Sequence, residues 1–188
     1  MEDSSCLLDK FIVDFSYQKV TEISRMTKQV QNNIKILFVC HGNICRSTMA
    51  ESVMTYLVKQ KKMEQSFYIN SAATSREEIG NPPHHGTVGK LREMKIPIIA
   101  HRAVQMTMQD YNAYDYLIGM DTANIRNMTR IAGGDNEGKI YKLLSFSGSG
   151  QDVADPWYTG DFDATYADVI EGCKGLLAYI LKNDRDKL

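Results

Sequence analysis

The sequence has little cysteine or proline and no excess of charge of either sign. Its 188 residues include four cysteines and four prolines, and 22 basic residues stand against 23 acidic ones, giving a formal net charge of -1. This composition excludes an intrinsically disordered chain, a collagen-like chain and a disulfide-rich scaffold. A nucleic-acid-binding domain usually carries a clear basic excess, so we expect no nucleic acid among the partners.

Long apolar runs and metal-binding spacings are also missing. No apolar run approaches the roughly 18 residues of a membrane span. The opening MEDSSCLLDK carries charge where a signal peptide needs an apolar stretch, so we expect a cytoplasmic protein with no membrane span. In that reducing compartment the cysteines are expected to be free thiols. They lack the paired spacing of a zinc site, and we predict no metal and no cofactor; they are Cys6, Cys40, Cys45 and Cys173.

The chain divides into residues 1–33, an extension, and residues 34–188, the main domain. The extension holds an apolar patch at helical spacing, which predicts either a short helix or a partly disordered leader: Leu7, Leu8, Phe11, Ile12 and Phe15. In the main domain, strands are predicted at 34–40, 67–72, 115–120 and 139–144. Helices are predicted at 47–62, 85–94, 162–181 and from Asp121 or Thr122 to about Ile131. Strands that alternate with helices indicate an α/β domain with a doubly wound, four-stranded parallel sheet, its first strand central.

The loop after the first strand has the residues of an anion site. It reads Cys40-His41-Gly42-Asn43-Ile44-Cys45-Arg46-Ser47 and leads directly into a predicted helix. Loop amides and a helix N-terminus carry partial positive charge, and an arginine can hold two phosphate oxygens with its planar fork. We expect Cys40 at the floor of this site as a thiolate, with Ser47 donating a hydrogen bond to it. A thiolate beneath a phosphate site indicates nucleophilic attack on phosphorus.

VCHGNICRS, followed by Glu51, resembles the signature of the low-molecular-weight protein tyrosine phosphatases. Further segments fall in that family's order, so the resemblance covers roughly residues 34–183: SAATSREEIGNPP (71–83), His101-Arg102-Ala103, YDYLIGMD (114–121) and DPWY (155–158). The resemblance implies a doubly wound, flavodoxin-like sheet flanked by helices. It also implies a metal-independent phosphatase that hydrolyses phosphotyrosine in proteins and aryl phosphate monoesters through a phosphocysteine intermediate.

The resemblance assigns a role to each site residue. Cys40 is the nucleophile, Arg46 binds the phosphoryl oxygens and Asp155 is the general acid, on a long loop that we expect to be flexible. The remaining loop residues bind the substrate: His41, Gly42, Asn43, Ile44, Cys45 and Ser47. Asn43 holds the loop in its strained shape, and Ser71 and His101 fix that asparagine. Trp157 and Tyr158 form an aromatic wall for the substrate ring, unless Trp157 packs into the core instead. Asp152 and Asp161 are interpreted as a solvated loop residue and a helix N-cap.

Some positions depart from the family pattern or leave alternatives open. His41 stands where the family often has an apolar residue. No aromatic residue lies in Arg76-Glu77-Glu78, so the family's peptide preference does not carry over. Cys45 either forms a reversible disulfide with Cys40 or packs as a small residue under the loop, and Cys173 is predicted to be a core thiol.

Two other functions use the same loop. An arsenate reductase of this fold needs further cysteines to relay a disulfide and leaves Asp155 unexplained. A non-catalytic phosphate-binding module needs neither Cys40 nor Asp155. For the phosphatase, the expected partner is a phosphotyrosine protein or a small aryl phosphate, and the protein is expected to be a monomer or weak homodimer.

Overall fold

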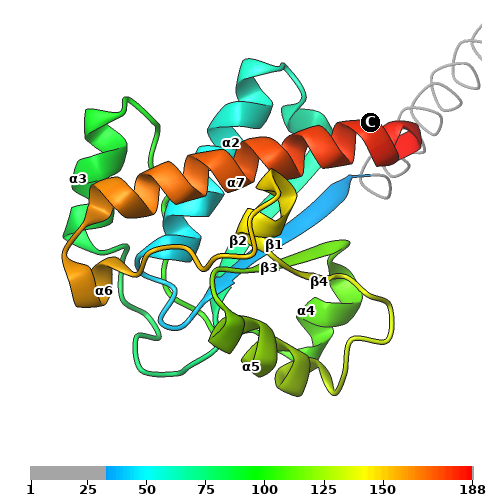
Figure 1. The fold of residues 1–188 in the computed structure, drawn as a ribbon, viewed down its shortest axis with the longest axis horizontal. Helices are drawn as coiled ribbons and strands as arrows, with labels where there is room; N and C mark the ends of the chain where they lie inside the picture. Colours follow the sequence, from blue (N-terminus) through cyan, green and yellow to red (C-terminus); the bar gives the residue numbers. More distant parts are fainter. Residues whose placement is uncertain (1–32, 188) are drawn as a thin grey trace, which may run out of the picture. The chain divides into compact units, whose positions relative to one another are not determined.

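The computed structural model describes residues 33–187 and contains a four-stranded parallel sheet. The apolar patch from Leu7 to Phe15 and Cys6 lie outside the described residues. The strands are β1 (Ile34–Cys40), β2 (Phe67–Ala73), β3 (Tyr116–Gly119) and β4 (Ile140–Lys142), in the order β2-β1-β3-β4 (Figure 1). Strand β1 is therefore interior and pairs with both β2 and β3, as the sequence predicts.

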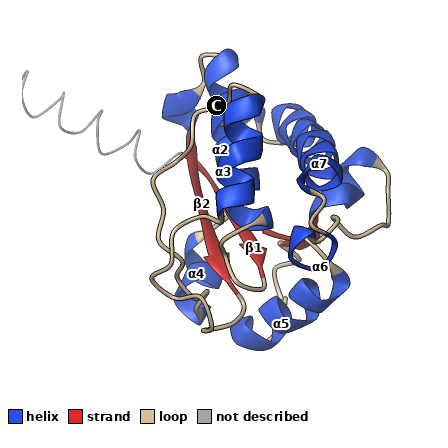
Figure 2. Cartoon of the chain, turned by 90° about the vertical axis from the view of Figure 1, so that its left-hand side faces the viewer, coloured by secondary structure: helices blue, strands red, loops and turns tan. Residues whose placement is uncertain are grey.

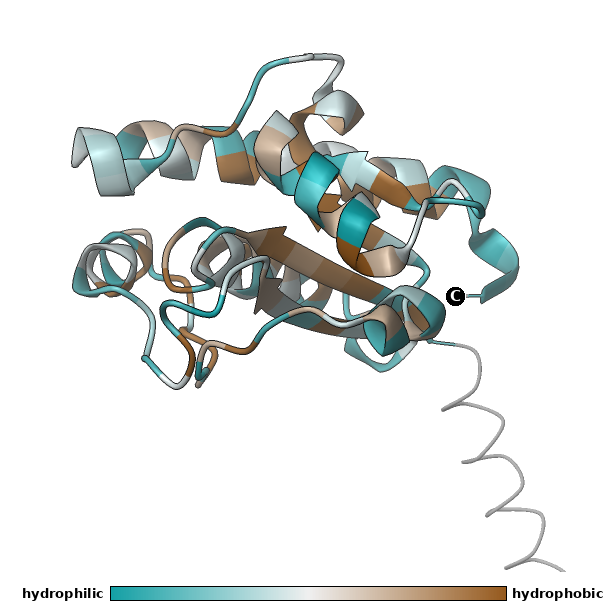
Figure 3. Ribbon diagram, turned by 90° about the horizontal axis from the view of Figure 1, so that it is seen from below, coloured by the Kyte–Doolittle hydropathy of each residue, from teal (hydrophilic) through white to brown (hydrophobic). Residues whose placement is uncertain are grey.

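Helices cover both faces of the sheet (Figure 2). The alternation of side chains along β1 shows why. Ile36 and Phe38 pack in a core with α2 and α7, whereas Leu37 and Val39 pack in a second core with α4 and α5. Successive strand residues point to opposite faces, so a strand buried on both sides is apolar throughout. Figure 3 shows the hydrophobic colour concentrated on neighbouring strands inside the domain.

The observed helices agree with the predicted ones and add short ones. The helices are α2 (Arg46–Gln60), α3 (His85–Glu93), α4 (Met108–Ala113), α5 (Thr122–Ala132), α6 (Pro156–Thr159) and α7 (Phe162–Asn183), and the 3₁₀ turns are η1 (Glu64–Ser66), η2 (Leu143–Ser147) and η3 (Arg185–Lys187). Sequence reasoning missed α4 and α6, which are too short to show a helical period. The predicted strand at 139–144 is too long, because Leu143 and Leu144 belong to η2 and are buried there.

The topology places one edge of the sheet where a ligand is expected. The order of the strands reverses between β1 and β3, and the carboxyl ends of these two neighbours lie side by side. Ligands of doubly wound sheets bind at such a switch point. Here it brings together Cys40, at the end of β1, and the N-terminus of α5, which follows β3. Within residues 33–187, no helix is both long and apolar enough to cross a membrane.

Candidate active site

Cys40 lies buried at the end of β1, below the first turn of α2. Its Sγ accepts a hydrogen bond from the backbone N–H of Asn43 at 3.3 Å and lies 3.1 Å from Ser47 Oγ. Ser47 Oγ already accepts an N–H from the Asn43 side chain at 2.9 Å, so the serine hydrogen is free to donate to the sulfur. The first turn of α2 contains no acidic residue, so its partial positive charge faces the loop uncompensated. These donors and the helix N-terminus all direct partial positive charge at the Cys40 sulfur.

Asn43 holds the loop in its shape. Its backbone is left-handed, with φ of 59°, a conformation that costs energy for a residue with a side chain. The side-chain amide donates to Ser47 and, at 2.8 Å, to Ser71. Its Oδ1 accepts from His101 Nε2 at 2.7 Å and from the backbone N–H of Val104 at 3.1 Å. The structure thus brings together Asn43, Ser47, Ser71 and His101, as the resemblance implies.

Beneath this network lies Glu51, to which the sequence analysis gave no role. Ser71 Oγ donates to Glu51 Oε2 at 2.6 Å, and His101 Nδ1 lies 3.4 Å from the same oxygen. Burial raises the pKa of Glu51 to about 7, against the opposing effect of the Ser71 hydrogen bond. Burial lowers the pKa of His101. Asn43 Oδ1 can only accept a hydrogen bond, so His101 Nε2 must carry the proton in the bond between them.

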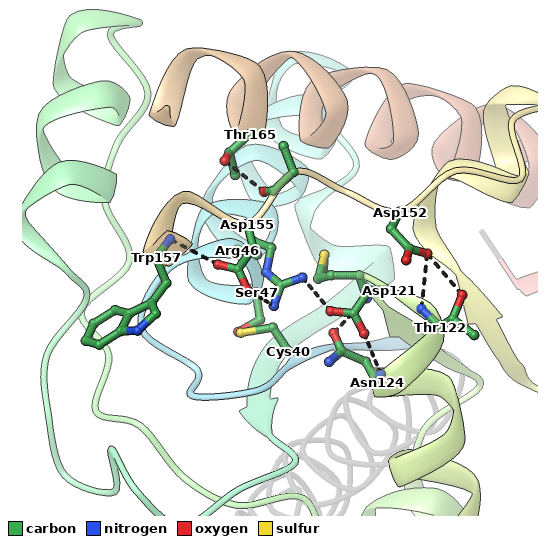
Figure 4. A network of polar contacts seen from close by, with 12 residues as sticks. Cys40, Arg46, Ser47, Asp121, Thr122, Asn124, Asp152, Asp155, Trp157 and Thr165 are labelled. Atoms are coloured by element: carbon green, nitrogen blue, oxygen red, sulfur yellow. Dashed lines mark hydrogen bonds and ion pairs between the residues drawn. The ribbon is translucent and has the colours of Figure 1, made fainter. Parts of the chain in front are cut away.

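Arg46 is buried between two carboxylates (Figure 4). Its Nη1 lies 2.6 Å from Asp121 Oδ2, and its Nη2 lies 2.5 Å from Asp155 Oδ2. Burial lowers the pKa of Arg46, but Cys40, Asp155 and Asp121 outweigh this effect and raise it. The guanidinium therefore stays charged, and it lines the same cavity as Cys40.

Asp121 contacts Arg46, which sequence reasoning did not predict, since it considered Asp121 only as a helix cap. It does cap α5, because its Oδ1 accepts the N–H of Asn124 at 2.6 Å. Its other oxygen holds Arg46. The available signal was its place directly after a strand that neighbours the strand of Cys40.

Asp155 lies at the rim of the site, on a segment that hydrogen bonds tie to the rest of the domain. The flexibility expected for this loop stays a prediction. Three hydrogen bonds hold the preceding residues, one to the residue after β3 and two to α7: Val153 N–H to the Met120 carbonyl at 2.8 Å, Ala154 N–H to Asp168 at 2.8 Å, and Thr165 Oγ1 to the Ala154 carbonyl at 2.9 Å. Asp155 itself caps α6, with Oδ1 accepting from the Trp157 N–H at 3.1 Å.

The two other aspartates of this region also have defined partners. Asp152 is not simply solvated, because its Oδ1 accepts from Lys142 Nζ at 2.7 Å and from Thr122. Asp161 caps α7 as predicted.

A cavity of about 140 Å³ opens above Cys40. Its lining includes most of the predicted substrate-binding residues, and also Glu77 and Glu78, which were not predicted to take part: Cys40, His41, Gly42, Ile44, Cys45, Arg46, Glu77, Glu78, Asp155, Trp157 and Tyr158. His41 Nε2 lies 3.0 Å from Glu77 Oε2 at the mouth. Trp157 and Tyr158 are 61% and 85% exposed, so the alternative that Trp157 packs into the core is wrong.

The described cysteines are Cys40, Cys45 and Cys173, all free thiols. Burial, with Cys40 and Asp155 nearby, raises the pKa of Cys45 to about 12, so that thiol stays protonated. The disulfide between Cys40 and Cys45 remains a prediction. Cys173 is fully buried in the core with α2 and α7, as predicted. Within residues 33–187, no group of three or more His, Cys, Asp and Glu side chains is arranged to hold a metal ion.

Comparisons with known proteins agree on one family. A sequence model described as low molecular weight phosphotyrosine protein phosphatase matches residues 35–186. The low molecular weight protein-tyrosine-phosphatase YfkJ of Bacillus subtilis is 41% identical over 151 residues, which is 79% of this chain and 97% of that protein. PtpA of Staphylococcus aureus, of the same description, is 35% identical over 80% of this chain and 96% of its own length.

Solved structures show the same likeness. The crystal structure of YfkJ superposes with a TM-score of 0.77, covering 80% of this chain and 96% of that one at 41% identity. The Streptococcus pyogenes phosphatase SP-PTP gives a TM-score of 0.72 at 38% identity, covering 81% of this chain and 96% of that one. A Drosophila arginine phosphatase gives 0.71 at 28% identity, covering 78% of this chain and 97% of that one.

Proposed function

The chain belongs to the low molecular weight phosphotyrosine protein phosphatase family, and from that premise we propose that Cys40, Arg46 and Asp155 carry out its metal-independent hydrolysis of phosphotyrosine and aryl phosphate monoesters. One observation carries the assignment of residues. Cys40 Sγ, the Arg46 guanidinium and the Asp155 carboxylate line one cavity, with two donors directed at the sulfur.

Binding exchanges one anion for another at Arg46. The guanidinium holds Asp121 through Nη1 and Asp155 through Nη2. A phosphoryl dianion entering above Cys40 displaces Asp155 from Nη2, while Asp121, fixed at the cap of α5, keeps Nη1. The substrate ring then rests between Trp157 and Tyr158. Asp155 is then free of the guanidinium and lies where it can carry the proton that the leaving oxygen requires.

In the first chemical step, Cys40 Sγ attacks phosphorus and the P–O ester bond breaks. Asp155 gives its proton to the leaving oxygen, so that a neutral phenol departs. Arg46, the loop amides and the N-terminus of α2 stabilise the negative charge on the equatorial oxygens. The product on the enzyme is a phosphocysteine.

In the second step, Asp155 accepts a proton from water, which attacks phosphorus as the P–S bond breaks. The Cys40 thiolate leaves, and its negative charge is received by the donors of Ser47 and Asn43. Inorganic phosphate then leaves, and Asp155 pairs again with Arg46 Nη2. The charge on the phosphoryl oxygens is offset by protein groups throughout, so the scheme needs no metal ion.

The two alternatives fit the described residues less well. A disulfide relay for arsenate reduction needs an accessible cysteine outside the loop, and among residues 33–187 the cysteine outside the loop is Cys173, which is fully buried. A phosphate-binding module needs neither the thiolate donors at Cys40 nor a carboxylate above them. Both features support the phosphatase.

The test is hydrolysis of an aryl phosphate with EDTA present. We expect the native protein to be active, Cys40→Ser to be inactive and Asp155→Ala to be slower by about 100-fold or more. Asp152→Asn is the matched control, because Asp152 lies on the same segment but does not line the cavity. Inactive native protein, when reduced and folded, contradicts the proposal; arsenate reduction with thioredoxin and phosphate binding are then the next assays.

We also propose the domain limits and setting that the sequence analysis predicted. Residues 34–188 form the phosphatase domain after the extension 1–33, and the family match to residues 35–186 supports this division. The proposed substrate is a phosphotyrosine protein or small aryl phosphate in the cytoplasm, and the protein acts as a monomer or weak homodimer. Sedimentation equilibrium of the full chain measures the last point directly.

A further inference from the structure

A second, wider hollow of about 650 Å³ adjoins the phosphate cavity. We call it the side groove; it lies along α3, and most of the surface that it exposes is apolar. Its lining includes Pro82, Pro83, Val88 and Gly89, together with the polar side chains of Asn81, His85 and Arg92. Ile44, Glu78 and Trp157 line both the side groove and the phosphate cavity. The two hollows therefore adjoin, and the Trp157 side chain lies at their boundary.

The side chain at the boundary of the two hollows is the Trp157 indole, and neighbouring aromatic rings support it. Trp157 follows the cap of α6, and Figure 4 shows its ring on the opposite side of Arg46 from Asp121. The His84 ring lies edge-on to it, with 6.3 Å between ring centroids, and stacks on Phe162 at 5.4 Å. His84 Nδ1 accepts the N–H of Gly86, which fixes the ring, and burial lowers the pKa of His84 and keeps it neutral. An indole that is 61% exposed on such a rigid support is suited to contact with an apolar ligand.

Gly89 has no explanation within the fold itself. It lies inside helix α3, where glycine is less stable than alanine, and its φ is not positive. A Cβ built at Gly89 meets no atom within 4 Å. Gly86 in the same helix differs, since a Cβ there would lie 2.3 Å from Phe162. The missing side chain at Gly89 relieves no strain and no crowding, but it keeps the side groove open.

We propose that the side groove binds an apolar side chain of the substrate polypeptide, one or two residues from the phosphotyrosine. The proposal rests on the proposed function, which places the phosphotyrosine ring against Trp157. A polypeptide leaving that ring crosses the shared boundary of Ile44 and Trp157 and enters the groove. The sequence Arg76-Glu77-Glu78 offers no aromatic contact at the mouth, so the side groove provides the apolar surface beside the ring.

The test compares three substrates: an aryl phosphate, a phosphotyrosine peptide with leucine at the two positions on each side of the phosphotyrosine, and the same peptide with serine at those positions. We expect the leucine peptide to have a KM about 10-fold lower than the serine peptide, since a leucine side chain is buried. Gly89→Leu places a side chain in the groove while improving the helix. It should raise the KM of the leucine peptide about 10-fold and leave the aryl phosphate and the serine peptide unchanged.

Arg126→Leu is the control, an added leucine on the exposed side of α5 that lines neither hollow. Inactivity of the native protein towards the aryl phosphate would remove the proposed function itself. With that activity intact, equal KM values for the two peptides overturn the side groove as a substrate site. A Gly89→Leu variant that loses as much activity towards the aryl phosphate as towards the leucine peptide also overturns it. A Gly89→Leu variant that changes only the oligomeric state overturns it as well, because the groove would then be an interface between copies of the chain.

Discussion

At the scale of single residues, the two carboxylates on Arg46 differ in how they are held. Asp121 is tied by one oxygen to the first turn of α5 and by the other to Nη1. Asp155 must leave Nη2 for a phosphate to bind, because both occupy the same cavity. We infer that Asp121 is a positioning residue: it fixes the guanidinium so that the exchange at Nη2 does not let Arg46 turn away.

Asp121→Asn tests this role without disturbing the helix. Asparagine is as good an N-cap as aspartate, so α5 and the free energy of unfolding should change little. The ion pair to Nη1 is lost, and a misplaced Arg46 should lower kcat/KM for an aryl phosphate by about 10- to 100-fold. The measurement is steady-state kinetics beside urea unfolding. An unchanged kcat/KM in a stably folded variant would show that Asp121 does not position Arg46.

Local spacing predicted the site residues whose partners are close to them in the sequence and missed Asp121 and Glu51, whose partners are distant. Cys40, Arg46 and Ser47 lie within eight consecutive residues, so their spacing alone indicated an anion site. Asp121 and Glu51 act through contacts across the fold, at 75 and 20 positions from their partners Arg46 and Ser71. No local pattern marks such contacts, because they exist only once β1 pairs with β3 and α2 packs on the sheet.

At the scale of elements, α7 packs closely on η2 because two glycines lie where they meet. A Cβ on Gly172 would lie 2.5 Å from the Leu143 side chain, and one on Gly175 only 2.4 Å from the carbonyl oxygen of Phe146. The spacing of three residues places both glycines on one side of the helix. The long helical period of this segment was readable in the sequence, but the need for glycine was not, since it comes from a neighbouring backbone.

Two substitutions to alanine therefore have opposite effects in helices of the same protein. Gly175→Ala forces a side chain against backbone and should destabilise the fold by about 1–3 kcal/mol, after the gain in helix propensity is offset. Gly89→Ala meets open space and should stabilise the fold by roughly 0.5–1 kcal/mol. Urea unfolding of both variants gives the two values. A stabilising Gly175→Ala would mean that α7 and η2 do not pack this closely.

At the scale of the whole molecule, the site is a product of strand order. Three segments that are distant in the sequence meet at one edge: the loop after β1, the N-terminus of α5 after β3, and the stretch from Asp152 to Trp157 that follows β4 and η2. The alternation of strands and helices predicts a parallel sheet, and the interior place of the first strand was predicted with it. The neighbours of the Asp155 segment were not predicted, because the hydrogen bonds from Val153 and Ala154 that hold it reach Met120, just after β3, and α7.

Glu51 and His101, which lie buried beneath the phosphate loop, link the stability of the whole molecule to pH. The folded pKa of Glu51 is about 7, above its ordinary value of 4.5, because burial disfavours the carboxylate. Between these values the folded state holds a proton that the unfolded chain has lost, so this carboxyl's contribution to stability falls as pH rises from about 4.5 to 7. The shift corresponds to a loss on the order of 2–3 kcal/mol. His101 acts in the opposite sense: burial lowers its pKa, so its contribution is lost as pH falls below about 6.5.

Glu51→Gln isolates the carboxyl, since glutamine keeps an oxygen for the Ser71 hydroxyl and does not titrate. The free energy of unfolding of the native protein minus that of Glu51→Gln should decrease by about 2–3 kcal/mol from pH 4.5 to 7 and then stay level, measured by urea unfolding at each pH. The contribution of His101 largely cancels in this difference. A difference that instead rises with pH would mean that Glu51 is ionised in the fold and paired with a protonated His101. His101 would then place a positive charge next to Asn43, directly below the phosphate loop.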